Sequence, residues 1–285
     1  METENSGILT AKCESCGSEI LFYNEKQCPF CGSYNIVSEE KSEKITADGV
    51  IHFKSDKSRI QQIFHNHIKN HFFAPSLLKN LDFTGIYIPF KLYDATALST
   101  YFGKGGRERT VKNKDGHQLT STDWRSLTGF IEEPYYDVPV CENEVYEDIE
   151  KILPYDLKNV IPYSDRRISG YPVLKSVTDE DSLFSKACKK MEKSLKSLSK
   201  KDINSRGFHY SSIEKIETHY TEVKSRKVLF PVWAASINYR GKMFSYMIND
   251  ENGKIIGKIP VSIAKIIILC AVLVLAVLCA SFFNN

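Results

Sequence analysis

The strongest constraint on this chain is an apolar run near its C-terminus. From Ile266 to Phe283 eighteen residues pass without a charged side chain, and Ser281 is the only polar residue among them. At 1.5 Å per residue a helix of this length measures roughly 27 Å, close to the hydrocarbon thickness of a bilayer. We therefore expect one C-terminal transmembrane helix, with residues 266–283 in the lipid bilayer. The alternative is a buried core helix, although core helices usually keep a polar face.

The charges beside this run predict its orientation. Lys254, Lys258 and Lys265 precede it, and no charged residue follows it. Lysines next to a membrane helix favour the cytoplasmic side, and the polar first ten residues do not resemble a signal peptide. We expect a tail-anchored, single-pass protein of the cell membrane whose N-terminal domains lie in the cytoplasm. Its cysteines would then be in a reducing compartment.

Four of the eight cysteines form one tight cluster. Cys13 and Cys16 are followed, after eleven residues, by Cys28 and Cys31, which gives the pattern C-x2-C-x11-C-x2-C. Two residues between cysteines allow one turn to direct both sulfurs at a single ion, and four thiolates leave no open coordination position. The pattern predicts one structural Zn²⁺ and no catalytic metal. Two disulfides are the alternative, which a reducing compartment disfavours.

The residues around the cysteines predict a zinc ribbon over residues 1–37. Gly17 and Gly32 directly follow the second cysteine of each pair, where a glycine permits the turn that faces a metal. Residues 19–23 and 34–37 are expected as strands. A segment of this size buries little core, so the metal is expected to supply much of its folding free energy.

After the ribbon we expect a charged, flexible linker over residues 38–49 and an α+β domain over residues 50–257. Asp56 or Ser58 could cap a first helix, which Pro75 limits. Its apolar positions recur at helical spacing: Ile60, Ile63, Phe64, Ile68 and Phe72.

Two stretches of this domain resemble each other. Residues 85–104 and 228–242 each contain an apolar strand with a proline, a second strand and the motif Tyr-x-Gly-Lys. Both follow an amphipathic helix, the second with these apolar positions: Leu183, Phe184, Ala187, Met191, Leu195 and Leu198. We expect two related helix-plus-β-hairpin units, each with a turn at its Tyr-x-Gly-Lys; chance similarity stays open. The last strand should lead, through an Asn252-Gly253 turn, into residues 258–285, the anchor region.

Other candidate sites have weaker support. His67 and His71 share a helix face and could bind a metal together, but no H-E-x-x-H pattern accompanies them. The basic stretch Lys104–Lys114 could contact anionic lipid or nucleic acid, although a solvated hairpin tip is the simpler interpretation. Glu132-Glu133 could form a carboxylate pair. Cys141 and Cys188 are expected to be inert.

The chain resembles bacterial zinc-ribbon membrane proteins described as TFIIB-type zinc ribbon-containing proteins. The resemblance rests on the four cysteines and on these segments: residues 85–94, 153–156, 169–171, 230–233, and Asn252-Gly253-Lys254 with Gly257. The family usually has Trp at the position of Lys91 and Ala-Glu where this chain has Pro172-Val-Leu. The resemblance implies the same fold and the ribbon metal, but no activity. The helicase label attached to some members has no motif here to support it.

For function, we expect a non-enzymatic adaptor whose ribbon contacts an unidentified cytoplasmic protein. The alternative is a protein that tethers DNA or RNA through the ribbon and Lys104–Lys114. Lys and Arg total 38 against 35 Asp and Glu, so charge alone does not indicate nucleic acid. No catalytic motif occurs, although catalytic groups from separate segments are compatible with the sequence. The partner, the process and the oligomeric state do not follow from the sequence.

Overall fold

The computed structural model describes residues 8–21, 27–41, 45–112, 118–143, 148–168, 171–176 and 178–283.

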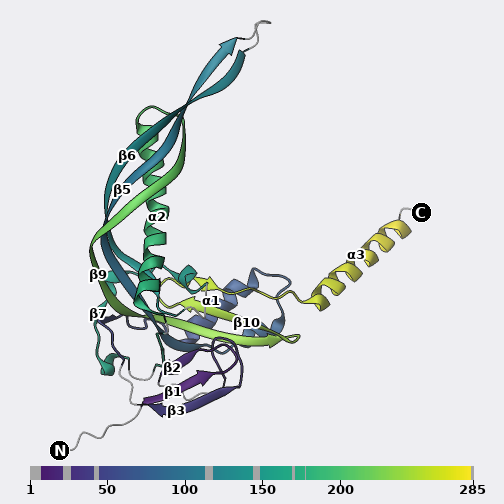
Figure 1. Cartoon of the computed structure of the whole chain (residues 1–285). Helices are drawn as coiled ribbons and strands as arrows, with labels where there is room; N and C mark the ends of the chain where they lie inside the picture. Colours follow the sequence, from purple (N-terminus) through teal and green to yellow (C-terminus); the bar gives the residue numbers. More distant parts are fainter. Residues whose placement is uncertain are drawn as a thin grey trace, which may run out of the picture. The chain divides into compact units, whose positions relative to one another are not determined.

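The chain forms a large mixed β-sheet accompanied by helices (Figure 1). The strands are β1 (Ile8–Cys13), β2 (Glu19–Leu21), β3 (Ile36–Lys41), β4 (Gly49–Val50), β5 (Thr84–Lys112), β6 (Gln118–Cys141), β7 (Ile161–Pro162), β8 (Val173–Leu174), β9 (Tyr210–Tyr239), β10 (Lys242–Asn249) and β11 (Ile255–Ile256). The described helices are α1 (Lys57–Lys69), α2 (Glu180–Ser205) and α3 (Ile263–Phe283), with short 3₁₀ turns η1 (Ser76–Asn80), η2 (Ile149–Ile152), η3 (Leu157–Asn159) and η4 (Asp165–Arg167).

Three strands are unusually long. β5, β6 and β9 contain 29, 24 and 30 residues, whereas strands of globular proteins average about 5–6. The chain divides into two compact units, and β5 and β9 contribute residues to both. Unit 1 comprises Met1–Pro89, Asn143–Val177 and Val228–Asn285, and unit 2 comprises Phe90–Glu142 and Thr178–Lys227. The predicted boundaries between ribbon, linker and α+β domain divide the chain into consecutive segments, which these two units do not test, so they stay predictions.

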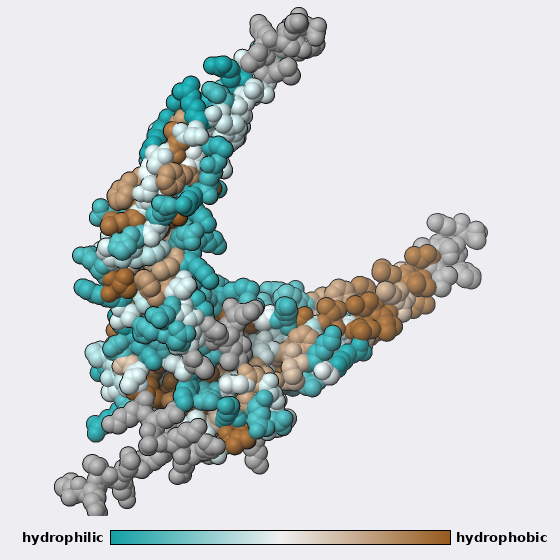
Figure 2. All heavy atoms as spheres, viewed as in Figure 1, coloured by the Kyte–Doolittle hydropathy of each residue, from teal (hydrophilic) through white to brown (hydrophobic). Residues whose placement is uncertain are grey.

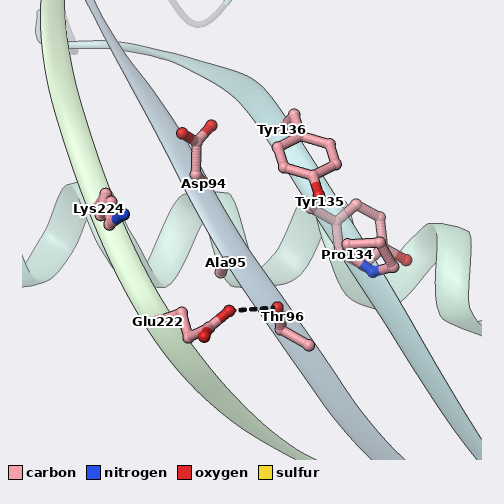
Figure 3. A pocket seen from close by; sticks show the side chains of 8 residues that line it. All are labelled: Asp94, Ala95, Thr96, Pro134, Tyr135, Tyr136, Glu222 and Lys224. Carbon is pink, nitrogen blue, oxygen red and sulfur yellow. Dashed lines mark hydrogen bonds between the residues drawn. The ribbon is translucent and has the colours of Figure 1, made fainter.

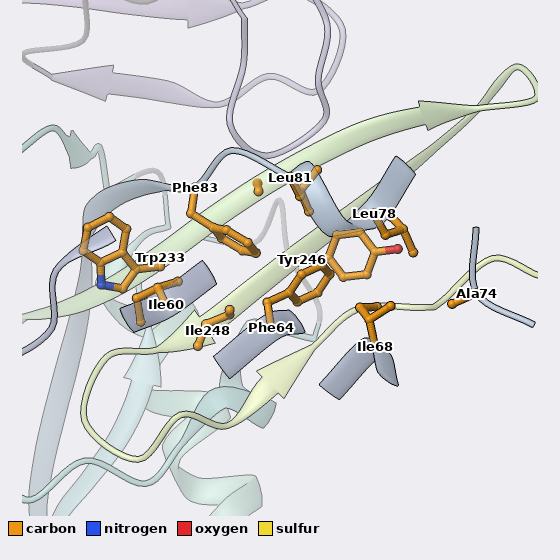
Figure 4. Packing of buried hydrophobic residues seen from close by; sticks show 11 residues of the cluster. Ile60, Phe64, Ile68, Ala74, Leu78, Leu81, Phe83, Trp233, Tyr246 and Ile248 are labelled. Atoms are coloured by element: carbon orange, nitrogen blue, oxygen red, sulfur yellow. The ribbon is translucent and has the colours of Figure 1, made fainter. Parts of the chain in front are cut away.

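The main core of unit 1 lies between α1 and the β9–β10 hairpin. Asp56 caps α1, as expected, because its carboxylate accepts a hydrogen bond from the Arg59 N–H at 2.8 Å. The buried face of α1 carries Ile60, Phe64 and Ile68. Figure 4 shows these side chains against residues of β9 and β10 and of the segment around η1: Trp233, Tyr246, Ile248, Leu78, Leu81 and Phe83.

Unit 2 consists of α2 and the long portions of β5, β6 and β9 (Figure 1). Asp179 caps α2 by accepting from the Ser182 N–H at 2.9 Å. The predicted apolar positions Leu183, Ala187 and Met191 are buried against side chains of β5 and β6: Tyr93, Ala95 and Val140. Nearer the end of α2, Ile203 packs with Tyr101 and Phe208.

The predicted pairing of each helix with its own hairpin is wrong. α1 precedes β5 in the sequence but packs on β9 and β10, whereas α2 precedes β9 and packs mainly on β5 and β6. The fold is therefore a large mixed sheet whose helices are exchanged between hairpins, and not two consecutive helix-plus-hairpin units. Helical and strand periodicity show which face of an element is buried, but they do not show which partner covers it.

The two Tyr-x-Gly-Lys motifs also differ. Residues 239–242 form the expected two-residue turn between β9 and β10, with φ of 55° at Arg240 and 75° at Gly241, as in a type I′ turn. Residues 101–104 lie inside β5, so the turn predicted there is wrong. Gly103 is needed for close packing instead, because a Cβ at this position would lie 2.5 Å from the Ser212 carbonyl oxygen.

The predicted transmembrane anchor is also corrected. The charge-free run does form a helix, α3, whose described side chains apart from Lys265 are apolar and largely exposed, and much of this helix is brown in Figure 2. Across the described residues, however, no helix has both the length and the apolar character that a membrane crossing requires. The helix is also not charge-free throughout, because Lys265 lies in its first turn. The predictions of a bilayer contact, a tail anchor and a cytoplasmic, single-pass orientation are withdrawn with it.

Candidate metal centre

The four clustered cysteines come together as the spacing predicts. One sulfur from each of Cys13, Cys16, Cys28 and Cys31 lies within 4.8 Å of the others. The Sγ atoms of Cys13 and Cys31 are 3.5 Å apart, and those of Cys16 and Cys28 are 3.7 Å apart. No disulfide links any of the four. Four sulfurs this close, from two separate turns, could bind a metal ion.

The two cysteine turns have the same backbone structure. In the first, the Gly17 N–H donates to the Cys13 carbonyl at 2.8 Å, and the Cys13 N–H donates to the Ser18 carbonyl at 2.9 Å. In the second, Gly32, Cys28 and Ser33 make the equivalent bonds at 2.8 Å each. Gly17 and Gly32 have φ of 75° and 70°, the left-handed region that glycine enters without steric cost. Each C-x2-C-Gly segment therefore forms the same tight turn.

The sulfur separations suit a tetrahedral zinc ion. A Zn–S bond of about 2.3 Å places tetrahedral sulfurs roughly 3.8 Å apart. The observed 3.5 and 3.7 Å are close to this value. Thiolate ligands in a closed set of four favour zinc among the common divalent ions. The residues present thus fit a zinc ion without rearrangement of the chain.

Burial and crowding oppose the ionisation of these thiols. Burial is the largest cause that raises the pKa of the Cys31 thiol to about 12, and the neighbouring thiols add to it. The pKa of the Cys28 thiol is raised as well, first by its hydrogen bond with Cys16 and then by burial. Crowded thiolates repel one another, so a bound cation is what would allow all four to ionise near neutral pH.

The second cysteine turn rests on the β9–β10 hairpin. The Ser236 hydroxyl donates to the Cys28 carbonyl oxygen at 3.2 Å, and the Ser245 hydroxyl donates to the Phe30 carbonyl oxygen. The Phe30 side chain is fully buried. At Gly32 a Cβ would lie 2.1 Å from the end of the Met243 side chain. Ribbon and hairpin are therefore in close contact within unit 1.

A strand pairing also joins the ribbon to the rest of unit 1. β2 pairs antiparallel with β8, with Ile20 opposite Leu174 and Leu21 opposite Val173. The Glu19 carboxylate forms ion pairs with Lys12 at 3.3 Å and with Lys175 at 3.2 Å, and these lysines lower the pKa of Glu19 against the effect of its burial. The expectation of a ribbon on a flexible tether did not anticipate this pairing.

Part of the ribbon faces away from these contacts. Tyr34 is 73% exposed and Val37 is 44% exposed, and Glu14, Ser15 and Asn35 are exposed as well. The Glu14 N–H donates to the Asn35 carbonyl at 3.0 Å, and the Ser15 and Ser33 hydroxyls are 2.7 Å apart. We call this set of five residues (Glu14, Ser15, Tyr34, Asn35 and Val37) the outer ribbon face.

The histidine candidates do not form a comparable site. The rings of His67 and His71 are 5.0 Å apart between centroids. Partial burial, followed by the proximity of His71, lowers the pKa of His67. Among the described residues, the four-cysteine cluster is the group of three or more metal-ligating side chains that could hold an ion. A third ligand for the histidine pair is absent from that part of the chain.

The two other polar candidates also have structural explanations. Lys104 forms an ion pair with Glu214 at 2.5 Å, and the Arg107 guanidinium lies 4.7 Å from the centre of the Phe208 ring. Residues 104–112 are part of β5 and not a loop, and residues 113–117 lie outside the described chain. Glu132 and Glu133 are consecutive in β6, so their carboxylates point to opposite faces of the sheet.

Unit 2 has a small surface hollow of about 110 Å³, shown in Figure 3. It lies where β5 and β6 change register beside Asp94, and Asp137 and Glu222 near it have positive φ values of 53° and 54°. The Asp137 N–H donates to Asp94 at 2.7 Å, and Arg226 donates to Asp137 at 2.6 Å. These bonds hold Asp94, Asp137 and Arg226 together at the β5–β6 bulge, where the strands change direction.

Sequence reasoning missed a buried polar cluster in unit 1. The Asp250 side chain accepts hydrogen bonds from the Trp233 indole N–H at 2.8 Å, from the Ser55 N–H at 3.1 Å and from the Lys54 N–H. Asn249, fully buried, donates to the Ile152 and Pro154 carbonyls at 3.0 Å each. The segments 153–156, 230–233 and 252–254 thus meet at the turn between β10 and β11. This contact gives their sequence motifs a structural explanation.

Comparison with known proteins gives little further guidance. No family model matches the chain, and no solved structure matches it. The chain is similar to the uncharacterized protein YdjG of Bacillus subtilis (strain 168), with 26% identity over 240 residues that cover 81% of this chain and 69% of that protein. The resemblance to the zinc-ribbon membrane proteins therefore rests on the cysteine cluster, which could form a zinc ribbon, and the family itself stays a prediction.

Proposed function

We propose that this chain is a zinc-binding, non-enzymatic adaptor in which the metal is structural and the ribbon contacts a partner protein. One observation carries the proposal: four cysteine sulfurs lie within 4.8 Å of one another, on two turns of identical backbone structure.

The donor set supports a structural role for the metal. A catalytic zinc site keeps a position open for water or substrate, whereas four thiolates fill the tetrahedron. Cys13 and Cys28 are buried, and the second turn is covered by the β9–β10 hairpin. A zinc ion here would hold the ribbon in shape and would not act on a substrate.

The outer ribbon face is the surface we assign to the partner. Its Tyr34 is 73% exposed, and tyrosine is among the residue types enriched at protein interfaces and their hot spots. Its charged member is Glu14, and it carries no basic stripe that would suit phosphates. Both cysteine turns contribute to this face, so its shape would depend on the metal.

Metal analysis of the purified full-length chain tests the first half of the proposal. We expect about one zinc per chain, lost in a Cys13→Ser/Cys16→Ser variant and kept in Cys188→Ser, a control that removes a thiol outside the cluster. Absence of zinc from the wild type, or its retention in the double variant, would contradict the metal assignment.

Photocrosslinking tests the second half. A photoreactive amino acid at position 34 should give one protein adduct, while the same residue at Lys215, exposed on β9, should not give it. The adduct should disappear in the Cys13→Ser/Cys16→Ser background. No adduct from position 34, or an unchanged adduct without the zinc ligands, would reject the outer ribbon face as a partner surface.

A further inference from the structure

Unit 2 contains a sheet edge with little protection against pairing. Its sheet has the strand order β6–β5–β9, and β6 pairs with β5 alone among the described strands. Figure 1 shows the β5–β6 pair continuing past the ends of α2 and β9. A long strand at an edge presents a row of backbone N–H and C=O groups that another strand can pair with.

The two edges of this sheet differ in composition. Residues 210–227 of β9 carry charged side chains along their length: Glu214, Lys215, Glu217, Glu222, Lys224, Arg226 and Lys227. Residues 118–131 of β6 carry two, Asp123 and Arg125, among Thr, Ser and apolar residues. Charges on edge strands oppose unwanted pairing. β9 has this protection, and the first half of β6 does not.

The backbone of β6 indicates which residues point outward. The Thr128 carbonyl accepts a hydrogen bond from the Arg206 side chain at 3.2 Å, which indicates that it faces away from β5. Pro134 is also even-numbered and has no N–H, so it fits a position whose N–H is not needed for pairing with β5. The N–H and C=O of one residue point to the same side of a strand, so the even-numbered residues, Trp124 included, direct their backbone groups to this edge. The Thr128 carbonyl would exchange its Arg206 donor for an N–H of the partner strand.

We propose that β6 is a dimerisation edge, in which residues 118–130 pair antiparallel with the same residues of a second copy about a two-fold axis at Trp124. An antiparallel pairing of identical strands is self-complementary, as a two-fold interface requires. The partner is a second copy because the charge pattern of this segment matches itself.

The charges select the register. With the axis at Trp124, Asp123 of each copy lies opposite Arg125 of the other, so both charged residues meet an opposite charge. An axis at either neighbouring residue would place Asp123 opposite Asp123 or Arg125 opposite Arg125. Within one chain these two side chains form a long ion pair of 3.7 Å and are 47% and 64% exposed. Both are therefore available to re-pair across the axis.

The uncharged residues of this register also match. Thr120 lies opposite Thr128, and Thr122 lies opposite Ser126, pairs that stabilise antiparallel sheets through hydroxyl hydrogen bonds and packing. Trp124 meets its own copy at the axis. Trp124 is 48% exposed, and its ring lies 6.4 Å from that of Tyr210, so dimerisation would cover an aromatic residue that is otherwise open to water.

Charge-swap variants of the full-length chain test the proposal, with sedimentation equilibrium as the readout. We expect a wild-type dimer. Asp123→Arg and Arg125→Asp should each weaken dimerisation by about tenfold or more, because each places like charges opposite each other. The double swap Asp123→Arg/Arg125→Asp should restore it. The matched control exchanges Lys215 and Glu217 on the β9 edge and should leave the dimer unchanged.

All these variants keep α3, so association through that helix would be common to them. Hydrogen exchange locates the contact: amides of the even residues from 118 to 130 should be protected more strongly as the wild-type concentration rises, while those of the control strand β9 should not. A monomeric wild type, single variants that dimerise normally, or a double swap as weak as its parents would overturn the proposal.

Discussion

Ser236, on β9, donates a hydrogen bond to the carbonyl oxygen of Cys28, a predicted metal ligand 208 residues away in the sequence, at 3.2 Å. Ser245, on the paired strand β10, donates in the same way to Phe30. Two side-chain-to-backbone hydrogen bonds therefore join the four-cysteine site to the hairpin. Folding of the ribbon and the integrity of this hairpin should depend on each other.

Removal of these two hydroxyls should loosen the ribbon. A Ser236→Ala/Ser245→Ala variant leaves the Cys28 and Phe30 carbonyls without their donors, at a cost of about 1 kcal/mol for each hydrogen bond. We expect lower stability to urea and faster transfer of zinc to a chelator. Ser197→Ala, at an exposed position of α2, is the control. Equal chelation rates in both variants would show that the contact does not support the metal site.

Substitution Asp250→Asn should destabilise unit 1. The side chain accepts from three N–H donors, and an amide NH₂ would place a further donor against one of them. The expected loss is about 1–3 kcal/mol in the free energy of unfolding. Asp56→Asn, on the neighbouring segment, is the matched control, because Asn caps a helix about as well as Asp. Similar urea midpoints for the two variants would be evidence against the buried polar cluster as a stabilising element.

Gly105→Ala should destabilise unit 2. A Cβ at this position would lie 2.4 Å from the Phe208 ring, so strand and ring would have to separate. We expect a loss of about 1–3 kcal/mol. Phe208→Ala removes the obstacle, so the double variant should lose less than the sum of the two single losses. If the losses in unfolding free energy of the two single variants add exactly in the double variant, contact with the Phe208 ring is not the reason for a glycine at position 105.

Alkaline pH should weaken the fold through its buried tyrosines. Burial raises the pKa of Tyr246 to about 12, from an ordinary value of 10, and its hydroxyl donates to the Lys258 carbonyl at 3.2 Å. Because the folded pKa is the higher one, this contribution is complete below pH 10 and is lost as the pH rises towards 12. Tyr246→Phe should lose less stability between pH 10 and pH 12 than the wild type, by up to about 1.4 kcal/mol per pH unit. Parallel stability profiles for the two proteins over this range would contradict the assignment.

The clustering of the four cysteines and many local elements could be predicted from the sequence. The spacing of the four cysteines and their following glycines fixes two identical turns, which depend on neighbouring residues alone. The cap at Asp56 follows from the residue type before the helix, and most buried positions of α1 and α2 follow from helical periodicity. Phe72 is an exception, because α1 ends at Lys69 and Phe72 is 67% exposed. The zinc ion itself stays a prediction.

The long-range arrangement could not be predicted. Ser236 and Ser245 lie in an ordinary strand pattern, and nothing in the local sequence shows that their hydroxyls reach the ribbon. Gly103 signals a turn by its local pattern, whereas its role is set by Ser212 on another strand. The apolar run of α3 indicates a helix, which forms, but its composition alone led to the membrane prediction that the structure does not support.

Hydrogen exchange of the full-length chain before and after zinc removal tests most directly whether a closed metal site holds the ribbon on the β9–β10 hairpin. We predict faster exchange at residues 28–33 and along β10 once a chelator has removed the metal, with α2 unchanged as an internal reference. Identical exchange in β10 with and without metal, or purification of the folded chain free of metal, would contradict the account.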